Sequence, residues 1–163
     1  MDDWFAVQVR VGHERRSASH LRLRGYEVLL PCYSERRRWS DRVKNVERPL
    51  FPGYLFSRFV PNVVAKLVSA PGVIRIVGDS AGPIAIPPNE AEALQRIVQT
   101  RAPAEPWPFL RVGERVRVED GPLRGAVGVI LSTEKRRRLV VSITLLQRAV
   151  AVELDPDWVS VSL

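Results

Sequence analysis

The side chains that most often carry catalysis or bind metals are few in this chain and widely spaced. Cys32 is the only cysteine, and the two histidines, His13 and His20, have no carboxylate nearby at metal-ligand spacing. The acidic residues are scattered and mostly adjoin arginines, so no pair is placed for general acid–base work. The sequence therefore predicts no disulfide, no metal site, no cofactor and no enzymatic activity.

Positive charge is more informative. The chain of 163 residues has a net charge of +7, and residues 1–60 hold 12 Lys and Arg against 7 Asp and Glu. This imbalance favours an anionic partner for the N-terminal part, with nucleic acid the leading candidate. Two groups are candidate contacts: Arg10 with Arg16 and His20, the last two one helical turn apart, and the run Arg36-Arg37-Arg38 in a long polar hairpin or loop.

An aromatic segment, Phe51-Pro52-Gly53-Tyr54-Leu55-Phe56, is the candidate for binding a protein partner. Proline favours an extended backbone at Phe51, and Gly53 relieves crowding where a strand begins. Aromatic side chains at a domain edge often dominate binding to a partner helix. We expect Phe51 and Tyr54 at an interface, and Phe56 or Leu55 in the core.

The elements that position these residues follow from periodicity. Residues 1–100 read as an α+β domain, an antiparallel sheet flanked by helices. A capping box at Asn89 and Glu92 starts its third helix, Asn62 caps the second, and Gly25 stops the first. The expected strands are Trp4–Val11, Tyr26–Leu30, Gly53–Phe59 and Val73–Val77, and the first two helices are His13–Arg24 and Val63–Ser69.

The pattern changes after residue 100. Residues 101–108 contain three prolines and predict an extended, semi-rigid linker. Residues 109–163 then read as a small SH3-like β-barrel, because short strands alternate with turn residues. Its strands are Val112–Val118, Gly125–Leu131, Leu139–Ile143, Arg148–Glu153 and Trp158–Val161. The β-branched content of 139–152 favours strands over a helical hairpin.

No apolar run reaches the ~20 residues of a membrane helix. The acidic N-terminus, Met1-Asp2-Asp3, does not resemble a signal peptide. A cytoplasmic protein without membrane contact is expected, with a monomer as the default.

Two sets of motifs resemble a known family. Val116-x-Val118-x-x-Gly121-x-x-x-Gly125-x-x-Gly128 resembles the KOW motif, with inward valines and glycines where the backbone turns or approaches closely. Trp4-Phe5-x-Val7-Gln8, Leu50–Phe56 and Pro71-Gly72-Val73 with Gly78 resemble successive signatures of the NGN domain. Together they cover essentially the whole chain and resemble the NusG family of transcription factors.

This resemblance implies an elongation factor that binds RNA polymerase at the β′ clamp helices and contacts the β subunit, suppressing pausing and modulating termination. It adds Trp4 and Val7 to Phe51, Pro52, Gly53 and Tyr54 as polymerase contacts. By analogy with RfaH, a specialised member, it makes the non-template DNA strand a candidate ligand of Arg10, Arg16 and His20. A KOW-containing ribosomal or ribosome-assembly RNA-binding protein is the alternative.

The KOW segment departs from housekeeping NusG. Leu123 and Ala126 stand at positions that are typically aromatic there, and Thr144–Gln147 lengthens the turn before Arg148. The expected partner surface is Leu123, Leu145, Leu146 and Arg148, with binding of Rho or a ribosomal protein left open. A specialised antiterminating paralogue of the RfaH, UpxY or LoaP kind is therefore expected.

Overall fold

The computed structural model describes residues 3–101, 103–107, 115–118, 121–132, 137–154 and 159–160. Its N-terminal part is built on a four-stranded antiparallel sheet in the order β2-β5-β1-β6. These strands are β1 (Asp3–Val9), β2 (Glu27–Leu29), β5 (Tyr54–Phe59) and β6 (Val73–Ile76). All four predicted strands are confirmed, with ends that differ by one or two residues.

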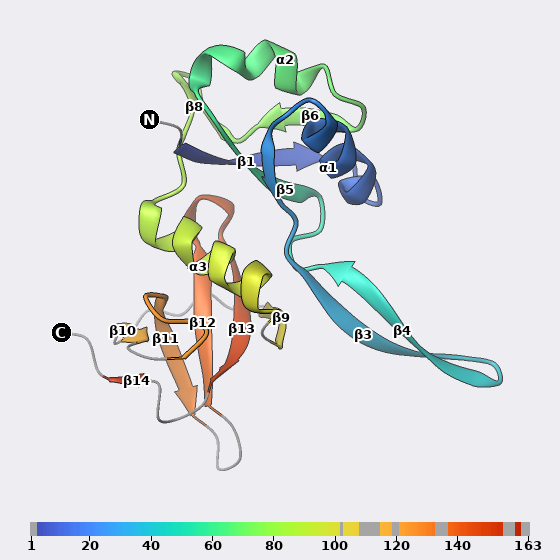
Figure 1. Cartoon of the computed structure of the whole chain (residues 1–163), viewed down its shortest axis with the longest axis vertical. Helices are drawn as coiled ribbons and strands as arrows, with labels where there is room; N and C mark the ends of the chain where they lie inside the picture. Colours follow the sequence, from blue (N-terminus) through green and yellow to red (C-terminus); the bar gives the residue numbers. More distant parts are fainter. Residues whose placement is uncertain are drawn as a thin grey trace.

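The alternation in β1 gives this sheet two apolar faces. Phe5, Val7 and Val9 lie in one core cluster, with Ala18 and Leu21 of α1 (Glu14–Leu23) and Leu67 of α2 (Val64–Val68). On the opposite face Trp4, Ala6 and Phe56 belong to a second cluster with Ala91, Leu94 and Ile97 of α3 (Pro88–Thr100). Helices thus cover both faces, as Figure 1 shows.

The helix starts differ from the prediction. A 3-10 turn, η1 (Pro61–Val63), precedes α2, whose N-cap is Val63 and not Asn62. Helix α3 begins at Pro88, so Asn89 lies inside its first turn, and its N-cap Pro87 makes no side-chain hydrogen bond. Both predicted caps are wrong because proline presets a helical φ and needs no N–H partner at a helix start. The expected stop at Gly25 is confirmed by its φ of +89°.

The polar segment forms a long hairpin of β3 (Cys32–Trp39) and β4 (Arg42–Pro49), which pair only with each other. Figure 1 shows it extending away from the rest of the molecule. A further small hairpin, β7 (Gly78–Asp79) with β8 (Gly82–Pro83), lies outside the sequence prediction. A Cβ at Gly78 would lie 2.1 Å from the Gly82 carbonyl oxygen, which explains why glycine stands there.

The C-terminal sheet has six antiparallel strands in the order β14-β10-β11-β12-β13-β9. The five predicted strands are confirmed as β10 (Arg115–Val118), β11 (Val127–Ser132), β12 (Arg137–Ile143), β13 (Arg148–Leu154) and β14 (Val159–Ser160). Strand β9 (Ala104–Trp107) falls within the predicted linker and pairs with β13. Residues 139–152 are strands around a 3-10 turn, η2 (Thr144–Leu146), and not a helical hairpin.

Glycines of the KOW motif stand where the backbone needs them. Gly121 and Gly125 have φ of +81° and +92°, and a Cβ at Gly128 would lie 2.3 Å from the Val140 carbonyl oxygen. Val118 is buried, whereas the side chain of Val116 lies outside the described residues.

The α+β fold class is confirmed. No helix in the described part of the chain is long and apolar enough to cross a bilayer.

Candidate functional site

The aromatic segment lies on the sheet face opposite to α1 and α2. Phe51 and Phe56 pack edge to face, with ring centroids 5.3 Å apart and an interplanar angle of 84°. Trp4 lies in the same cluster, and Tyr54 packs against it while partly exposed. Phe51 is only 1% exposed, because α3 and the C-terminal sheet contribute to that cluster. The structure thus brings Trp4, Phe51 and Tyr54 together.

Val7 lies elsewhere. Successive residues of a strand point to opposite faces, and Val7 belongs to the cluster beneath α1 and α2. It is fully buried there, so the structure does not group it with Phe51 and Trp4.

The turn at Pro52 and Gly53 is held by a residue that the sequence did not reveal. The Gly53 N–H donates to the Glu14 carboxylate at 3.2 Å, and the Gly53 carbonyl accepts from the Val9 N–H at 2.8 Å. Glu14 is 4% exposed, although it begins helix α1. Gly53 has a φ of +82°, which favours glycine. Glu14 therefore positions the aromatic segment, and only long-range contact identifies it.

The C-terminal sheet covers this face through specific polar contacts. The Glu90 carboxylate on α3 accepts hydrogen bonds from the Thr144 N–H at 3.0 Å and the Thr144 hydroxyl at 2.8 Å. The Arg148 guanidinium lies 5.7 Å from the centroid of the Tyr54 ring, within cation–π range. The sequence marked Thr144 only as part of a long turn and gave no sign of Glu90 or of their contact, because the two residues are 54 positions apart.

The predicted KOW partner surface takes part in this covering. Leu123 is 1% exposed and belongs to the cluster that contains Phe51, and Leu145 and Leu146 pack against that cluster. Residues of two candidate surfaces, each predicted for a different partner, therefore belong to or pack against one cluster, to which α3 also contributes. Figure 1 shows α3 between the two sheets.

The cationic candidates lie on two separate elements. Arg10 follows β1 and is exposed, while Arg16 and the partly exposed His20 lie on the outer side of α1. Leu23 lies on the same side of this helix and is 85% exposed, a feature that the sequence reading missed. Arg36, Arg37 and Arg38 are on hairpin strand β3; Arg36 and Arg38 are exposed, and the side chain of Arg37 lies outside the described residues.

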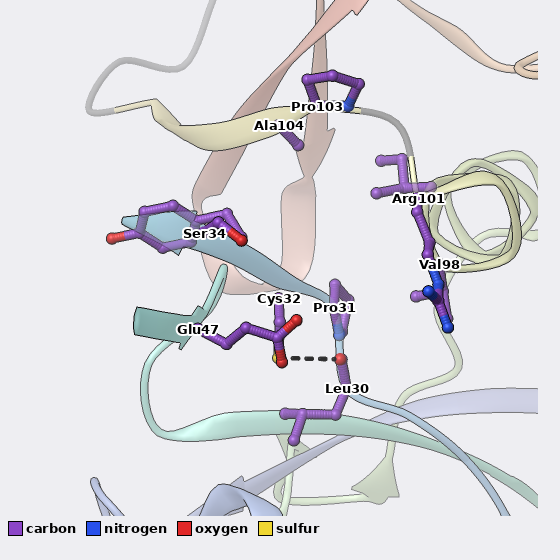
Figure 2. A pocket seen from close by; sticks show the side chains of 11 residues that line it. Leu30, Pro31, Cys32, Ser34, Glu47, Val98, Arg101, Pro103 and Ala104 are labelled. Atoms are coloured by element: carbon purple, nitrogen blue, oxygen red, sulfur yellow. Dashed lines mark hydrogen bonds between the residues drawn. The ribbon is translucent and has the colours of Figure 1, made fainter. Parts of the chain in front are cut away.

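A cavity of about 610 Å³ lies between the base of the hairpin, the end of α3 and β9. Figure 2 shows Cys32 within it, where the thiol donates to the Leu30 carbonyl at 3.4 Å. Burial raises the pKa of this thiol, and the Arg15 guanidinium nearby partly opposes the shift. The lining of the cavity includes Glu47, Val98 and Arg101. Among the described residues, no three metal-ligating side chains come together.

Comparison with known proteins agrees with this architecture. The family model described as "Transcription termination factor nusG" matches residues 2–95. The protein named "Transcription termination/antitermination protein NusG" from Escherichia coli K12 is 32% identical over 166 residues, covering 93% of this chain and 92% of that protein. The Vibrio cholerae protein of the same name is 31% identical, covering 93% and 91%.

One solved structure, "Domain interaction in Thermotoga maritima NusG", superposes with a TM-score of 0.59 at 22% identity, covering 100% of this chain and 98% of that one. This likeness concerns the fold alone. The family model and the bacterial relatives decide the assignment: the chain belongs to the NusG family of transcription termination and antitermination factors.

Proposed function

We propose that this transcription factor binds elongating RNA polymerase at the β′ clamp helices through the aromatic face of its N-terminal sheet. Phe51, Tyr54 and Trp4 supply apolar area, and Pro52 and Gly53 set the path of the segment. Contact with the β subunit on the other side of the DNA channel then keeps the clamp closed and suppresses pausing. The supporting observation is the cluster of Trp4, Phe51 and Phe56 on one sheet face, with Tyr54 at its edge.

Binding at this face requires the C-terminal sheet to move away. Phe51 is 1% exposed in the closed arrangement, so a partner helix has no access to its ring. The polar contacts that hold the C-terminal part closed are two hydrogen bonds and a cation–π contact at solvent-accessible positions, beside the apolar packing of Leu123, Leu145 and Leu146. Each polar contact is worth about 1 kcal/mol, so these contacts by themselves oppose opening only weakly. Opening also frees Leu123, Leu145, Leu146 and Arg148 for a second partner.

The test is binding of the full chain to immobilised elongation complexes of a cognate polymerase, with pausing scored in the same reactions. Tyr54→Ala is the informative variant, because Phe51 is so deeply buried that Phe51→Ser also threatens folding. Tyr26→Ala is the matched control: Tyr26 is also partly buried but packs on the opposite face. We expect Tyr54→Ala to weaken binding at least tenfold and Tyr26→Ala to leave it unchanged.

Since Tyr54→Ala also loses the Arg148 contact, the comparison is repeated in a Glu90→Ala background, where the closed form is already weakened. Equal binding by the Tyr54 and Tyr26 variants in both backgrounds would overturn the proposed face.

We further propose a specialised antiterminating paralogue. Its support is the aliphatic pair Leu123 and Ala126, at positions that are typically aromatic in housekeeping relatives, with the long turn at Thr144–Leu146. Read-through of Rho-dependent terminators by the purified chain tests this. Enhanced Rho termination instead would indicate a housekeeping factor. Arg10, Arg16 and His20 are proposed contacts of the non-template strand, and Arg36, Arg37 and Arg38 of nucleic acid more generally.

A further inference from the structure

The hairpin of β3 and β4 is exposed along most of its length. Each strand has eight residues, which at about 3.3 Å per residue gives a ribbon about 26 Å long. Two-stranded ribbons are marginally stable by themselves, and this one pairs with no other described strand. A ribbon projecting in this way contributes little to the core, which points to a role in binding.

One charge pair ties the base of the ribbon to the body: the Arg15 guanidinium on α1 lies 3.2 Å from the Glu47 carboxylate. A second pair, Arg48 with Glu35, links the two strands of the ribbon to each other. The acidic side chains of the strands are therefore engaged near the base. These contacts fix where the ribbon leaves the sheet.

The outer half of the ribbon has cations on both faces. Residues directly opposite in an antiparallel pair share a face, and neighbours along a strand alternate. Arg36 is opposite Asn45 and Arg38 opposite Val43, which places these arginines on one face. Arg42 and Lys44, at the alternate register positions, lie on the other face.

These four side chains are exposed, and none has an ion-pair partner among the described residues. Two acidic residues adjoin them in sequence: Asp41 at the tip, next to Arg42, and Glu35, which precedes Arg36 and pairs with Arg48. Free cations on two opposite faces match a site with negative charge on both sides. A flat anionic surface or one extended strand would meet only one face.

We propose that this ribbon inserts into the major groove of duplex DNA, with Arg36 and Arg38 contacting one phosphate backbone and Arg42 and Lys44 the other. The major groove of B-form DNA is about 12 Å wide and admits a two-stranded β-ribbon. The major groove of A-form RNA is too narrow and deep for side chains to read, which favours DNA. This inference extends the nucleic-acid contact proposed for the hairpin arginines. It rests on the proposed polymerase function only for the complex in which the contact is made.

The test uses the full chain and a fluorescein-labelled duplex of mixed sequence, without polymerase, over a range of salt concentrations. Each phosphate contact that is lost should lower the slope of log K against log salt by about 0.9 for duplex DNA. We expect Arg36→Gln with Arg38→Gln to lower it by about 1.8, and Arg42→Gln with Lys44→Gln to do the same. Lys66→Gln with Arg124→Gln removes two exposed charges elsewhere and serves as the matched control.

Three outcomes would overturn the inference: an equal loss in the control pair, a loss confined to one face of the ribbon, or binding of the single strand as tight as that of the duplex. Failure of the proposed polymerase function gives a different result. In that case the chain still binds duplex DNA through both faces, but elongation complexes do not retain it.

Discussion

The contact between Glu90 and Thr144 provides the sharpest test of the closed arrangement. One carboxylate accepts two hydrogen bonds, at 3.0 and 2.8 Å, from a residue on the other side of the interface. Both positions are at least partly exposed, so each hydrogen bond should contribute only about 1 kcal/mol. Glu90→Ala removes both and should shift the closed-to-open ratio about 30-fold. Thr144→Val removes only the hydroxyl and should shift it about fivefold.

Glu90→Gln is the matched control for shape. Its amide keeps one acceptor for the Thr144 N–H, and its NH₂ group can donate to the hydroxyl oxygen. It should therefore shift the ratio much less than Glu90→Ala. The apparent affinity of a ligand falls in proportion to the fraction of protein that is competent to bind. While the open form is minor, the affinity for polymerase should therefore rise by the same factors. The rise should be largest in Glu90→Ala, smaller in Thr144→Val and smallest in Glu90→Gln.

The assay combines two measurements on the full chain. Spin labels at Ala65→Cys on α2 and Arg124→Cys before β11, in a Cys32→Ser background, report the distance between the two parts. We expect a narrow distribution for the parent, and a broad, longer component that grows in Glu90→Ala. Binding to elongation complexes is measured on the same variants without labels. An unchanged distribution together with unchanged polymerase affinity in Glu90→Ala would refute the reasoning.

Three further predictions concern single residues. Arg148→Ala removes the cation over Tyr54, worth about 0.5–1 kcal/mol, and should favour opening two- to fivefold in the spin-label measurement. Cys32 should alkylate with a midpoint at higher pH in the folded chain than in urea, because burial raises its thiol pKa. The contribution of the neutral thiol to folding stability is then fully present below the pKa of the thiol in the unfolded state. It is lost as the pH rises through the pKa of the thiol in the folded state. Cys32→Ser should abolish that dependence in urea unfolding. Gly72→Ala should cost about 1–3 kcal/mol in the same unfolding assay, because Gly72 has a φ of +83° and a Cβ there would lie 2.5 Å from the Ser17 hydroxyl oxygen.

Local pattern was enough for most of the elements. The alternation in β1 agrees with a strand that has two faces, since the structure places Phe5 on one and Trp4 on the other. Strands over residues 139–152 followed from β-branched content, since branched side chains suit a pleated surface. Helix starts failed at Asn62 and Asn89, where capping spacing competed with nearby prolines and the proline positions prevailed.

The candidate site shows where local pattern stops. Residue type and spacing marked Phe51 and Tyr54 as aromatic residues of one segment, because strand periodicity acts over a few positions. What covers them depended on residues far away in the chain: Glu90 meeting Thr144, and Arg148 lying over Tyr54. The sequence by itself thus determined most of the strands, the turn glycines and the charge of the hairpin. Only the tertiary structure decided that two candidate binding surfaces cover each other, because contacts between distant segments arise from packing and have no local periodicity.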